Sequence, residues 1–338
     1  MKAFFLYGKE DMRPQEVALP PVEDYDLLIK ILACGVCGSD MRMFFSGPSP
    51  RYALPIVLGH EFTGRVTQLG PKVRGYAVGD LVTVAPIIPC LRCNFCTHGQ
   101  DNLCENGQVI GCNVQGAFAE FMHIPGPMVM AGGVVKLPPE ADPRGAALTE
   151  LVGCCLHGLH QVGVEPGDRV LIIGDGPIGL TFLQLARLMG AGYVATSGHR
   201  PARRQLAREL GAHEALDGRA VDLKGRFSRS LDLVIVAAAN IDVTAEALEL
   251  VRPGGRLLLF SGYVYGTTMP LDVNAVHYRE LHISGSIDCT INDFRRAAQL
   301  LPQLQMQRLI SASFPLDRTV EAFRAGKDPD AVKVIVEP

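Results

Sequence analysis

The second half of the chain alternates short apolar runs with amphipathic segments. Largely apolar runs predict buried strands at residues 170–173, 193–196, 231–237 and 255–260. Between them, apolar residues recur at helical spacing over residues 201–210 and 243–251. Strands and helices that alternate in this way form a parallel sheet with helices on both faces. We therefore expect a doubly wound α/β domain here.

The first part of the chain has a different pattern. Alternating apolar and polar residues predict short strands at residues 2–6 and 26–31, and prolines and glycines interrupt the sequence up to Pro143. This pattern is typical of an irregular β-rich domain rather than of a helical bundle. The remaining expected elements are a helix at 148–157, an amphipathic run at 294–304 and a closing strand at 332–336.

The first strand of the α/β half runs into the turn Gly174-Asp175-Gly176-Pro177-Ile178-Gly179. In a G-x-G-x-x-G turn, the first glycine permits the tight turn and the second lets the backbone approach a pyrophosphate. The third lets helix and strand pack closely. Pro177 can open the following helix, whose free N–H groups attract phosphate. Because a strand precedes the turn and a helix follows it, we favour dinucleotide binding over a purely structural turn.

Composition narrows the class of protein. The chain has 338 residues, 48% of them hydrophobic and 20% charged, with a net charge of −3. This balance is typical of a globular protein, and the charge argues against nucleic-acid binding. The N-terminal apolar run is too short for a signal peptide and no run has membrane-spanning length, so we expect a cytoplasmic enzyme. In that compartment, ten cysteines favour metal binding or catalysis over disulfides.

Four cysteines lie close together in the sequence: Cys90, Cys93, Cys96 and Cys104. Four thiolates at this spacing can surround one tetrahedral zinc ion, which would brace a loop and leave no position open for chemistry. An iron–sulfur cluster could use a similar spacing, and disulfide pairs are a further alternative. The expected cytosolic location weakens the disulfide alternative, so we favour structural zinc.

A second cluster mixes ligand types, with Cys34 and Cys37 followed by His60 and Glu61. Thiolate, imidazole and carboxylate are the usual zinc ligands, and three protein ligands leave one position open for a substrate. The alternative is that both cysteines are core residues and His60 is an ordinary buried histidine. Sequence distance alone does not decide between the two.

Together these motifs resemble the zinc-dependent medium-chain alcohol dehydrogenase family. The matching segments follow the family's order over nearly the whole chain: Cys37-Gly38-Ser39-Asp40, Gly59-His60-Glu61, the four cysteines, Glu150 and residues 174–179. The resemblance implies a GroES-like catalytic domain at 1–150 and 286–338, with a zinc lobe at about 88–106. It also implies a Rossmann domain at 151–285.

The resemblance further implies two zinc ions per chain. Cys37 and His60 would hold a catalytic zinc, with Glu61 and Glu150 as the candidate carboxylate ligands, and the four clustered cysteines would hold a structural one. Zinc would act as a Lewis acid on the oxygen of an alcohol that passes hydride to a nicotinamide. Ser39 matches the family's hydroxyl that carries away the substrate proton, although it could be an ordinary turn serine.

Two positions depart from the family pattern near these residues. Many relatives carry a histidine five residues after the cysteine that matches Cys37, where it continues the proton relay, but this chain has Arg42. Leu151 replaces the proline that often follows the glutamate, which is a milder change. The path by which the proton leaves is therefore not the usual one.

The end of the second Rossmann strand bears on the choice of cofactor. NAD-specific domains usually carry an acidic residue there, whereas this chain has Gly198, His199 and Arg200. Small and cationic residues would accommodate a 2′-phosphate, and the segment is similar to the Gly-Ser-Arg turn of NADP-using members. Cations in a first helical turn are unfavourable unless an anion lies nearby, so we favour NADP over NAD. Lys333 matches a basic family position near the cofactor phosphates, although it could be an exposed strand lysine.

We therefore expect a zinc-dependent alcohol dehydrogenase, loosely similar to the polyol and sugar-alcohol members. A simple secondary-alcohol dehydrogenase or an aldehyde–ketone reductase is an alternative among enzymes. The alternative from another class is a non-catalytic protein that binds zinc and nucleotide. Family likeness also implies a homo-oligomer, either a dimer or a tetramer.

Overall fold

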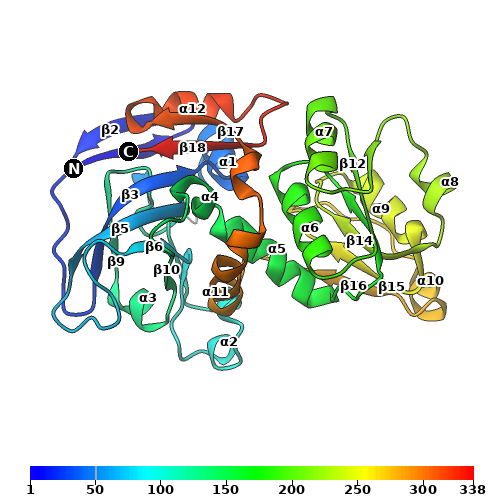
Figure 1. Ribbon diagram of the computed structural model, residues 1–338, viewed down its shortest axis with the longest axis horizontal. Helices are drawn as coiled ribbons and strands as arrows, with labels where there is room; N and C mark the ends of the chain where they lie inside the picture. Colours follow the sequence, from blue (N-terminus) through cyan, green and yellow to red (C-terminus); the bar gives the residue numbers. More distant parts are fainter. Residues whose placement is uncertain (50–51) are drawn as a thin grey trace. The chain divides into compact units, whose positions relative to one another are not determined.

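The computed structural model describes residues 1–49 and 52–338 of the chain. These residues form two compact units, each drawn with its elements in Figure 1. Unit 1 comprises Met1–Gly153 and Cys289–Pro338, and unit 2 comprises Cys154–Asp288. The boundaries expected from the sequence, 150/151 and 285/286, each lie three residues before those of the structure.

Unit 1 is built mainly from β-strands. Its larger sheet has the order β10-β6-β5-β3-β18-β17, and β9 also pairs with β3. The strands are β3 (Leu27–Gly35), β5 (Glu61–Leu69), β6 (Leu81–Val84), β9 (Phe121–Ile124), β10 (Val134–Lys136), β17 (Ile310–Pro315) and β18 (Lys333–Glu337). A smaller sheet contains β1 (Lys2–Gly8), β2 (Asp11–Glu16) and β4 (Ile56–Val57). The C-terminal strand β18 pairs antiparallel with β3 and so returns the end of the chain to unit 1.

Short helices cover unit 1. They are α1 (Gly38–Ser46), α3 (Gly126–Met130), α4 (Pro143–Ala147), α11 (Ile291–Leu300) and α12 (Thr319–Ala325), and α5 (Thr149–Val162) begins here. The run expected at 294–304 is α11, which starts earlier because the Thr290 hydroxyl accepts a hydrogen bond from the N–H of Asp293. It ends before Pro302, which lies in the 3-10 turn η2 (Leu301–Gln303).

Unit 2 contains a fully parallel six-stranded sheet in the order β13-β12-β11-β14-β15-β16. The strands are β11 (Arg169–Ile173), β12 (Tyr193–Gly198), β13 (Glu214–Asp217), β14 (Leu231–Val236), β15 (Val251–Leu259) and β16 (His282–Gly285). The helices are α6 (Pro177–Leu188), α7 (Pro201–Glu209), α8 (Leu223–Phe227), α9 (Ile241–Leu250) and α10 (Val273–Tyr278). The first strand of the unit, β11, lies in the middle of the sheet. The later strands are added on both sides of it, so the predicted doubly wound fold is confirmed.

Two strands of this sheet did not stand out in the hydrophobic pattern. β13 and β16 have four residues each and carry polar residues, since they lie at the two edges. By contrast, the central strands are mostly apolar, and Leu171, Val234 and Leu257 are almost completely buried. Among the described residues, no helix is both long and apolar enough to cross a membrane.

Candidate metal centres and nucleotide site

Asp40 organises the start of α1 and links it to a second segment of unit 1. Its Oδ2 accepts a hydrogen bond from the backbone N–H of Cys37, 3.1 Å away, within the first turn of α1. Its Oδ1 accepts one from the N–H of Gly59 at 3.4 Å and lies 3.5 Å from Nδ1 of His60. Asp40 itself is 2% exposed. One buried carboxylate therefore fixes both Cys37 and His60, and it leaves Nε2 of His60 for another partner.

The structure brings Cys37, His60 and Glu61 together, with one potential ligand atom from each within 4.8 Å of the others. Cys37 follows β3, and Glu61 is the first residue of the neighbouring strand β5. The pairing of these strands sets Gly35 opposite Glu61 and so determines which side chains meet. A three-donor group that leaves room for a further ligand is the arrangement of a catalytic zinc site.

Lys333 has a different partner from the one expected. Its Nζ lies 2.6 Å from Oε1 of Glu61, and the two side chains are 3% and 1% exposed. The sequence suggested either contact with cofactor phosphates or an exposed strand lysine, and the second of these is wrong. Burial opposes the charged form of Lys333, but the carboxylate of Glu61 outweighs it and raises the pKa of the lysine. The ammonium group of Lys333 thus lies at the edge of the three-donor group, in contact with Glu61.

The donor set fits a zinc ion. Oε2 of Glu61 is buried and has no hydrogen-bond partner among the described residues, so one carboxylate oxygen remains available. Burial lowers the pKa of His60, but the negative charges of Asp40 and Cys37 outweigh that effect and raise it well above its usual range. The imidazole thus lies among negative groups that a bound cation would neutralise. Sulfur, nitrogen and oxygen donors of this kind suit zinc.

The other predicted residues near this group take different positions. Glu150, the second residue of α5, is 8% exposed and lies outside the three-donor group, but its charge helps to raise the pKa of Lys333. Ser39 is half-buried in the first turn of α1. Cys34 is buried, with its thiol 3.7 Å from the Gly35 carbonyl oxygen, and burial raises its pKa well above the usual value. A protonated core thiol is a poor metal ligand.

The four-cysteine lobe forms a second group in which all four sulfur atoms lie within 4.8 Å of one another. Its segment contains β7 (Ile87–Ile88), α2 (Asn94–Thr97), η1 (Asp101–Leu103) and β8 (Gln108–Val109). The backbone N–H groups of Arg92 and Cys93 donate toward the sulfur of Cys90 and lower its pKa to about 6, which favours the thiolate. The N–H of Cys90 donates to the sulfur of Cys104 at 3.2 Å. Four converging sulfurs with backbone donors fit a closed tetrahedral zinc site.

In unit 2, the three glycines of the turn after β11 have the properties that their predicted roles require. Gly174 has a φ of +127°, and a Cβ atom on Gly179 would lie 2.0 Å from the carbonyl oxygen of Gly174. A Cβ on Gly176 would meet nothing within 4 Å, so the space beside the backbone there is open. Pro177 and Ile178 open α6 directly after it, with Gly176 as the N-cap. These features suit a pyrophosphate at the N-terminus of α6.

The cavity beside this turn contains a carboxylate that the sequence interpretation overlooked. A cavity of about 200 Å³ is lined by Gly174, Asp175, Ser197, Gly198, His199, Asp222, Asn240 and Glu246, among others. Asp175, a residue of the glycine turn itself, is 7% exposed and accepts a hydrogen bond from the backbone N–H of Arg200 at 3.3 Å. Sequence reasoning missed it because the pairing of β11 and β12, and not sequence proximity, brings the turn beside residue 198.

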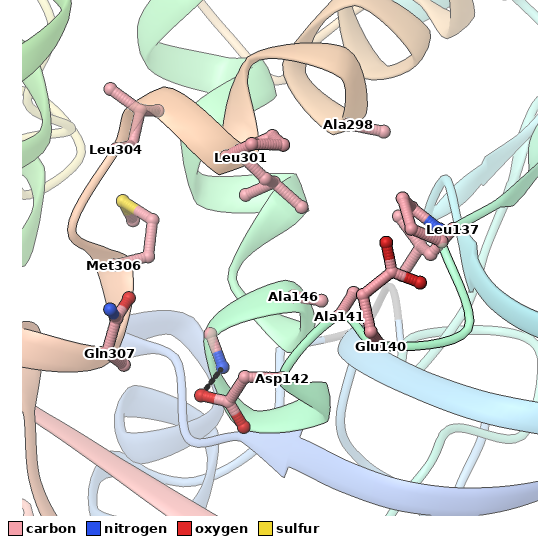
Figure 2. Close-up of a pocket in the computed structure, with 13 residues that line it drawn as sticks. Leu137, Glu140, Ala141, Asp142, Ala146, Ala298, Leu301, Leu304, Met306 and Gln307 are labelled. Carbon is pink, nitrogen blue, oxygen red and sulfur yellow. Dashed lines mark hydrogen bonds between the residues drawn. The ribbon is translucent and has the colours of Figure 1, made fainter.

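A separate pocket in unit 1 contains none of these candidate residues. It has a volume of about 290 Å³ and lies between α4, α11 and the turns after α11 (Figure 2). Its lining is mostly apolar, as Figure 2 shows for Leu137, Leu301, Leu304 and Met306. The Asp142 carboxylate on its wall accepts a hydrogen bond from the N–H of Gly145 and so caps α4. We assign no function to this pocket.

Comparison with known proteins shows which protein families the chain resembles. Residues 23–139 match the alcohol dehydrogenase GroES-like domain, and residues 177–303 match the zinc-binding dehydrogenase family. The chain is 30% identical to D-arabitol-phosphate dehydrogenase from Enterococcus avium, over 98% of this chain and 95% of that protein. It is 28% identical to sorbitol dehydrogenase from Halalkalibacterium halodurans, over 98% and 97% of the two chains.

A solved structure agrees with these matches. A zinc-binding dehydrogenase from Sinorhizobium meliloti 1021, bound to NADP, is 33% identical and superposes with a TM-score of 0.93, covering 100% of this chain and 99% of that one. A GroES-like unit with converging candidate zinc ligands and a Rossmann unit with a glycine turn define an NAD(P)-linked oxidoreductase. The chain belongs to the zinc-binding alcohol dehydrogenase family. The fold and the family expected from the sequence are thus confirmed.

Proposed function

We propose that the protein interconverts a secondary hydroxyl of a polyol or sugar alcohol and the corresponding ketone, with NADP(H) preferred over NAD(H). The observation that carries this proposal is the partly buried group of Cys37, His60 and Glu61 with the ammonium of Lys333 at its edge. The relatives named above act on a sugar-alcohol phosphate and on sorbitol, which supports a polyhydroxylated substrate.

Cys37, His60 and Glu61 would hold the catalytic zinc, and Glu150 is the alternative candidate for the carboxylate ligand. Bound zinc supplies a Lewis acid that lowers the pKa of the substrate hydroxyl, and the nicotinamide supplies the hydride acceptor. Asp40 fixes the orientation of His60 through Nδ1. Cys90, Cys93, Cys96 and Cys104 would hold a second zinc that braces the lobe.

Ser39 would relay the proton of the substrate hydroxyl, since its oxygen takes that proton as its own hydroxyl proton passes to an acceptor. Arg42 lies three residues further along α1 and therefore on the same face, and it is exposed. A guanidinium remains charged at any ordinary pH, so Arg42 cannot take the proton from Ser39. The proton would then leave Ser39 to water, and Arg42 would instead attract negative charge on the substrate or cofactor.

The cofactor would bind to unit 2 through its glycine turn. Gly174, Gly176, Pro177, Ile178 and Gly179 would receive the pyrophosphate at the start of α6. The small Gly198, the exposed His199 and the guanidinium of Arg200 would form the surroundings of a 2′-phosphate. The NADP bound to the Sinorhizobium protein supports this choice. The ammonium of Lys333 contacts Glu61, and its role at the cofactor phosphates stays a prediction.

Initial rates of nicotinamide oxidation and reduction, followed by absorbance, test the proposal. Both cofactors would be offered with polyols, polyol phosphates and simple secondary alcohols. We expect turnover with a polyol or its phosphate and a preference for NADP. Faster turnover of simple alcohols would favour the secondary-alcohol dehydrogenase alternative. Lack of turnover in protein that contains two zinc ions per chain would favour the non-catalytic alternative.

A second copy of the chain would pair with the edge strand β16. That strand ends the sheet of unit 2 within the described residues, and apolar side chains near it in sequence are more than half exposed: Val264, Tyr265, Val273, Tyr278 and Ile287. Exposed apolar residues beside a free strand edge are typical of an interface between subunits. Sedimentation of the active enzyme would reveal a dimer or a tetramer, and a monomer would contradict this part of the proposal.

A further inference from the structure

Asp175 is a buried carboxylate in the cofactor cavity that the proposed function does not yet use. Two groups at the start of α7 hold it: the N–H of Arg200 is 3.3 Å from Oδ2, and Nη1 of Arg203 is 3.9 Å from Oδ1. The side chains of Arg203 and Asp175 are 18% and 10% exposed. The anion that a cationic first turn of α7 requires is therefore supplied, in part, by the protein itself.

Asp175 also explains the glycine at the end of β12. A Cβ atom on Gly198 would lie 1.9 Å from Oδ2 of Asp175 and 2.0 Å from its Cγ. No side chain can therefore occupy position 198 while Asp175 keeps its place. The strand end lacks the acidic residue of NAD-specific domains, but a carboxylate from the glycine turn fills the space beside it.

This placement changes the electrostatics expected for the cavity. A phosphate monoester carries between one and two negative charges at neutral pH, so at the start of α7 it would meet both the guanidinium of Arg200 and the carboxylate of Asp175. The attraction and the repulsion therefore oppose each other. An unphosphorylated ribose has hydroxyl donors instead, and a carboxylate accepts their hydrogen bonds.

We propose that Asp175 is a specificity-determining residue that weakens the preference for NADP(H) and allows NAD(H) to bind as well. This inference rests on the proposed nucleotide site. Arg200 favours the 2′-phosphate, Asp175 favours the free hydroxyl, and the balance between them sets the ratio of the two affinities. Both residues are needed to account for the cofactor choice, which the residues at the strand end alone would assign to NADP.

The test measures dissociation constants of NAD⁺ and NADP⁺ by isothermal titration calorimetry, for wild type and Asp175→Asn. The amide keeps the shape of the side chain but removes its charge. We expect the ratio of the NAD⁺ to the NADP⁺ dissociation constant to rise at least about tenfold, because a like charge beside the phosphate is lost. An unchanged ratio, or a shift toward NAD⁺, would overturn the inference.

Two further variants separate this effect from general damage to the cavity. Asp217→Asn removes a carboxylate at the end of β13 that pairs at 3.0 Å with Arg204 of α7 but does not line the cavity, and it should leave the ratio unchanged. Arg200→Gln should move the ratio toward NAD⁺, opposite to Asp175→Asn. If Asp175→Asn does not fold, Asp175→Ser replaces it with the same expectation. Wild-type protein that binds neither nucleotide would instead refute the proposed nucleotide site.

Discussion

The two candidate metal groups in unit 1 contain good zinc ligands but are built differently. The lobe takes four identical donors from the single stretch Cys90 to Cys104, and its sulfurs receive hydrogen bonds from backbone N–H groups. The second group takes three unlike donors from two segments, with Cys37 in one and the adjacent His60 and Glu61 in the other. Buried side chains from other elements, Asp40 and Lys333, hold those donors.

The difference indicates what each group can do. Four thiolates complete a tetrahedral shell, so the lobe needs no partners beyond its own backbone and leaves no position for a substrate. Three unlike donors leave one coordination position open. The charge around the ion, which a fourth thiolate would otherwise help to balance, then depends on charged neighbouring side chains. We expect substitutions at the first site to change chemistry and substitutions in the lobe to change stability.

The largest expected effect separates the two groups directly. Cys37→Ser replaces a thiolate with a weakly coordinating hydroxyl and should reduce kcat/KM at least about a thousandfold, since several kcal/mol of charge stabilisation is lost. Nucleotide binding should persist, because the glycine turn lies in unit 2. Enzyme assays, calorimetry and elemental analysis of zinc would measure the three properties.

Cys96→Ser is the matched variant in the lobe. It should lower the zinc content by the same amount as Cys37→Ser, and it should reduce thermal stability more than it reduces the turnover of the protein that remains folded. Near wild-type turnover in Cys37→Ser would refute the assignment of the catalytic group. Equal loss of turnover in both variants would refute the distinction between the two groups.

Much of this arrangement could be predicted from the sequence, because the motifs are local. The glycine turn sits between a strand and a helix that are both recognisable in the sequence, and the four cysteines lie within one short segment. The partners of Lys333 and Asp175 could not be predicted, because they depend on strand pairing. β18 lies beside β3, which is paired with β5, and this order carries Lys333 to Glu61 from the far end of the chain.

The cofactor prediction likewise lacks a contact that depends on strand pairing. The end of β12, where the family usually carries an acidic residue, has none. The parallel pairing of β11 with β12 places Asp175 beside Gly198, although 23 positions separate them in the sequence. Spacing along the chain predicts the elements of a βα unit, but the contacts across the sheet determine which charges meet.

Breaking the buried ion pair at the metal group should lower the stability of the fold more than breaking an exposed pair of the same length. Lys333–Glu61 and Lys72–Asp24 both span 2.6 Å, but the first pair is 3% and 1% exposed and the second 55% and 51%. Lys333→Met leaves a buried carboxylate without its cation and should lower the free energy of unfolding by about 3–5 kcal/mol. Lys72→Met should change it little, because water screens that pair.

Urea unfolding of the zinc-loaded protein would measure both variants. Lys333→Arg serves as a further control, because it keeps the positive charge while changing its shape, and it should recover part of the lost stability. Similar effects of Lys333→Met and Lys72→Met would show that zinc alone neutralises Glu61. The ammonium would then have no separate role at the three-donor group.

The smallest effect concerns the carboxylate behind the histidine. Asp40→Asn keeps the shape of the side chain but removes the negative charge 3.5 Å from Nδ1 of His60, so affinity for the catalytic zinc should fall about tenfold to a hundredfold. Competition with a chelator would measure it, with Asp80→Asn as a control on an exposed pair with Lys136. The lobe zinc should be unaffected by Asp40→Asn, because backbone N–H groups rather than this carboxylate support its sulfurs. Equal weakening of both zinc ions would mean that Asp40 stabilises unit 1 as a whole and does not act through His60.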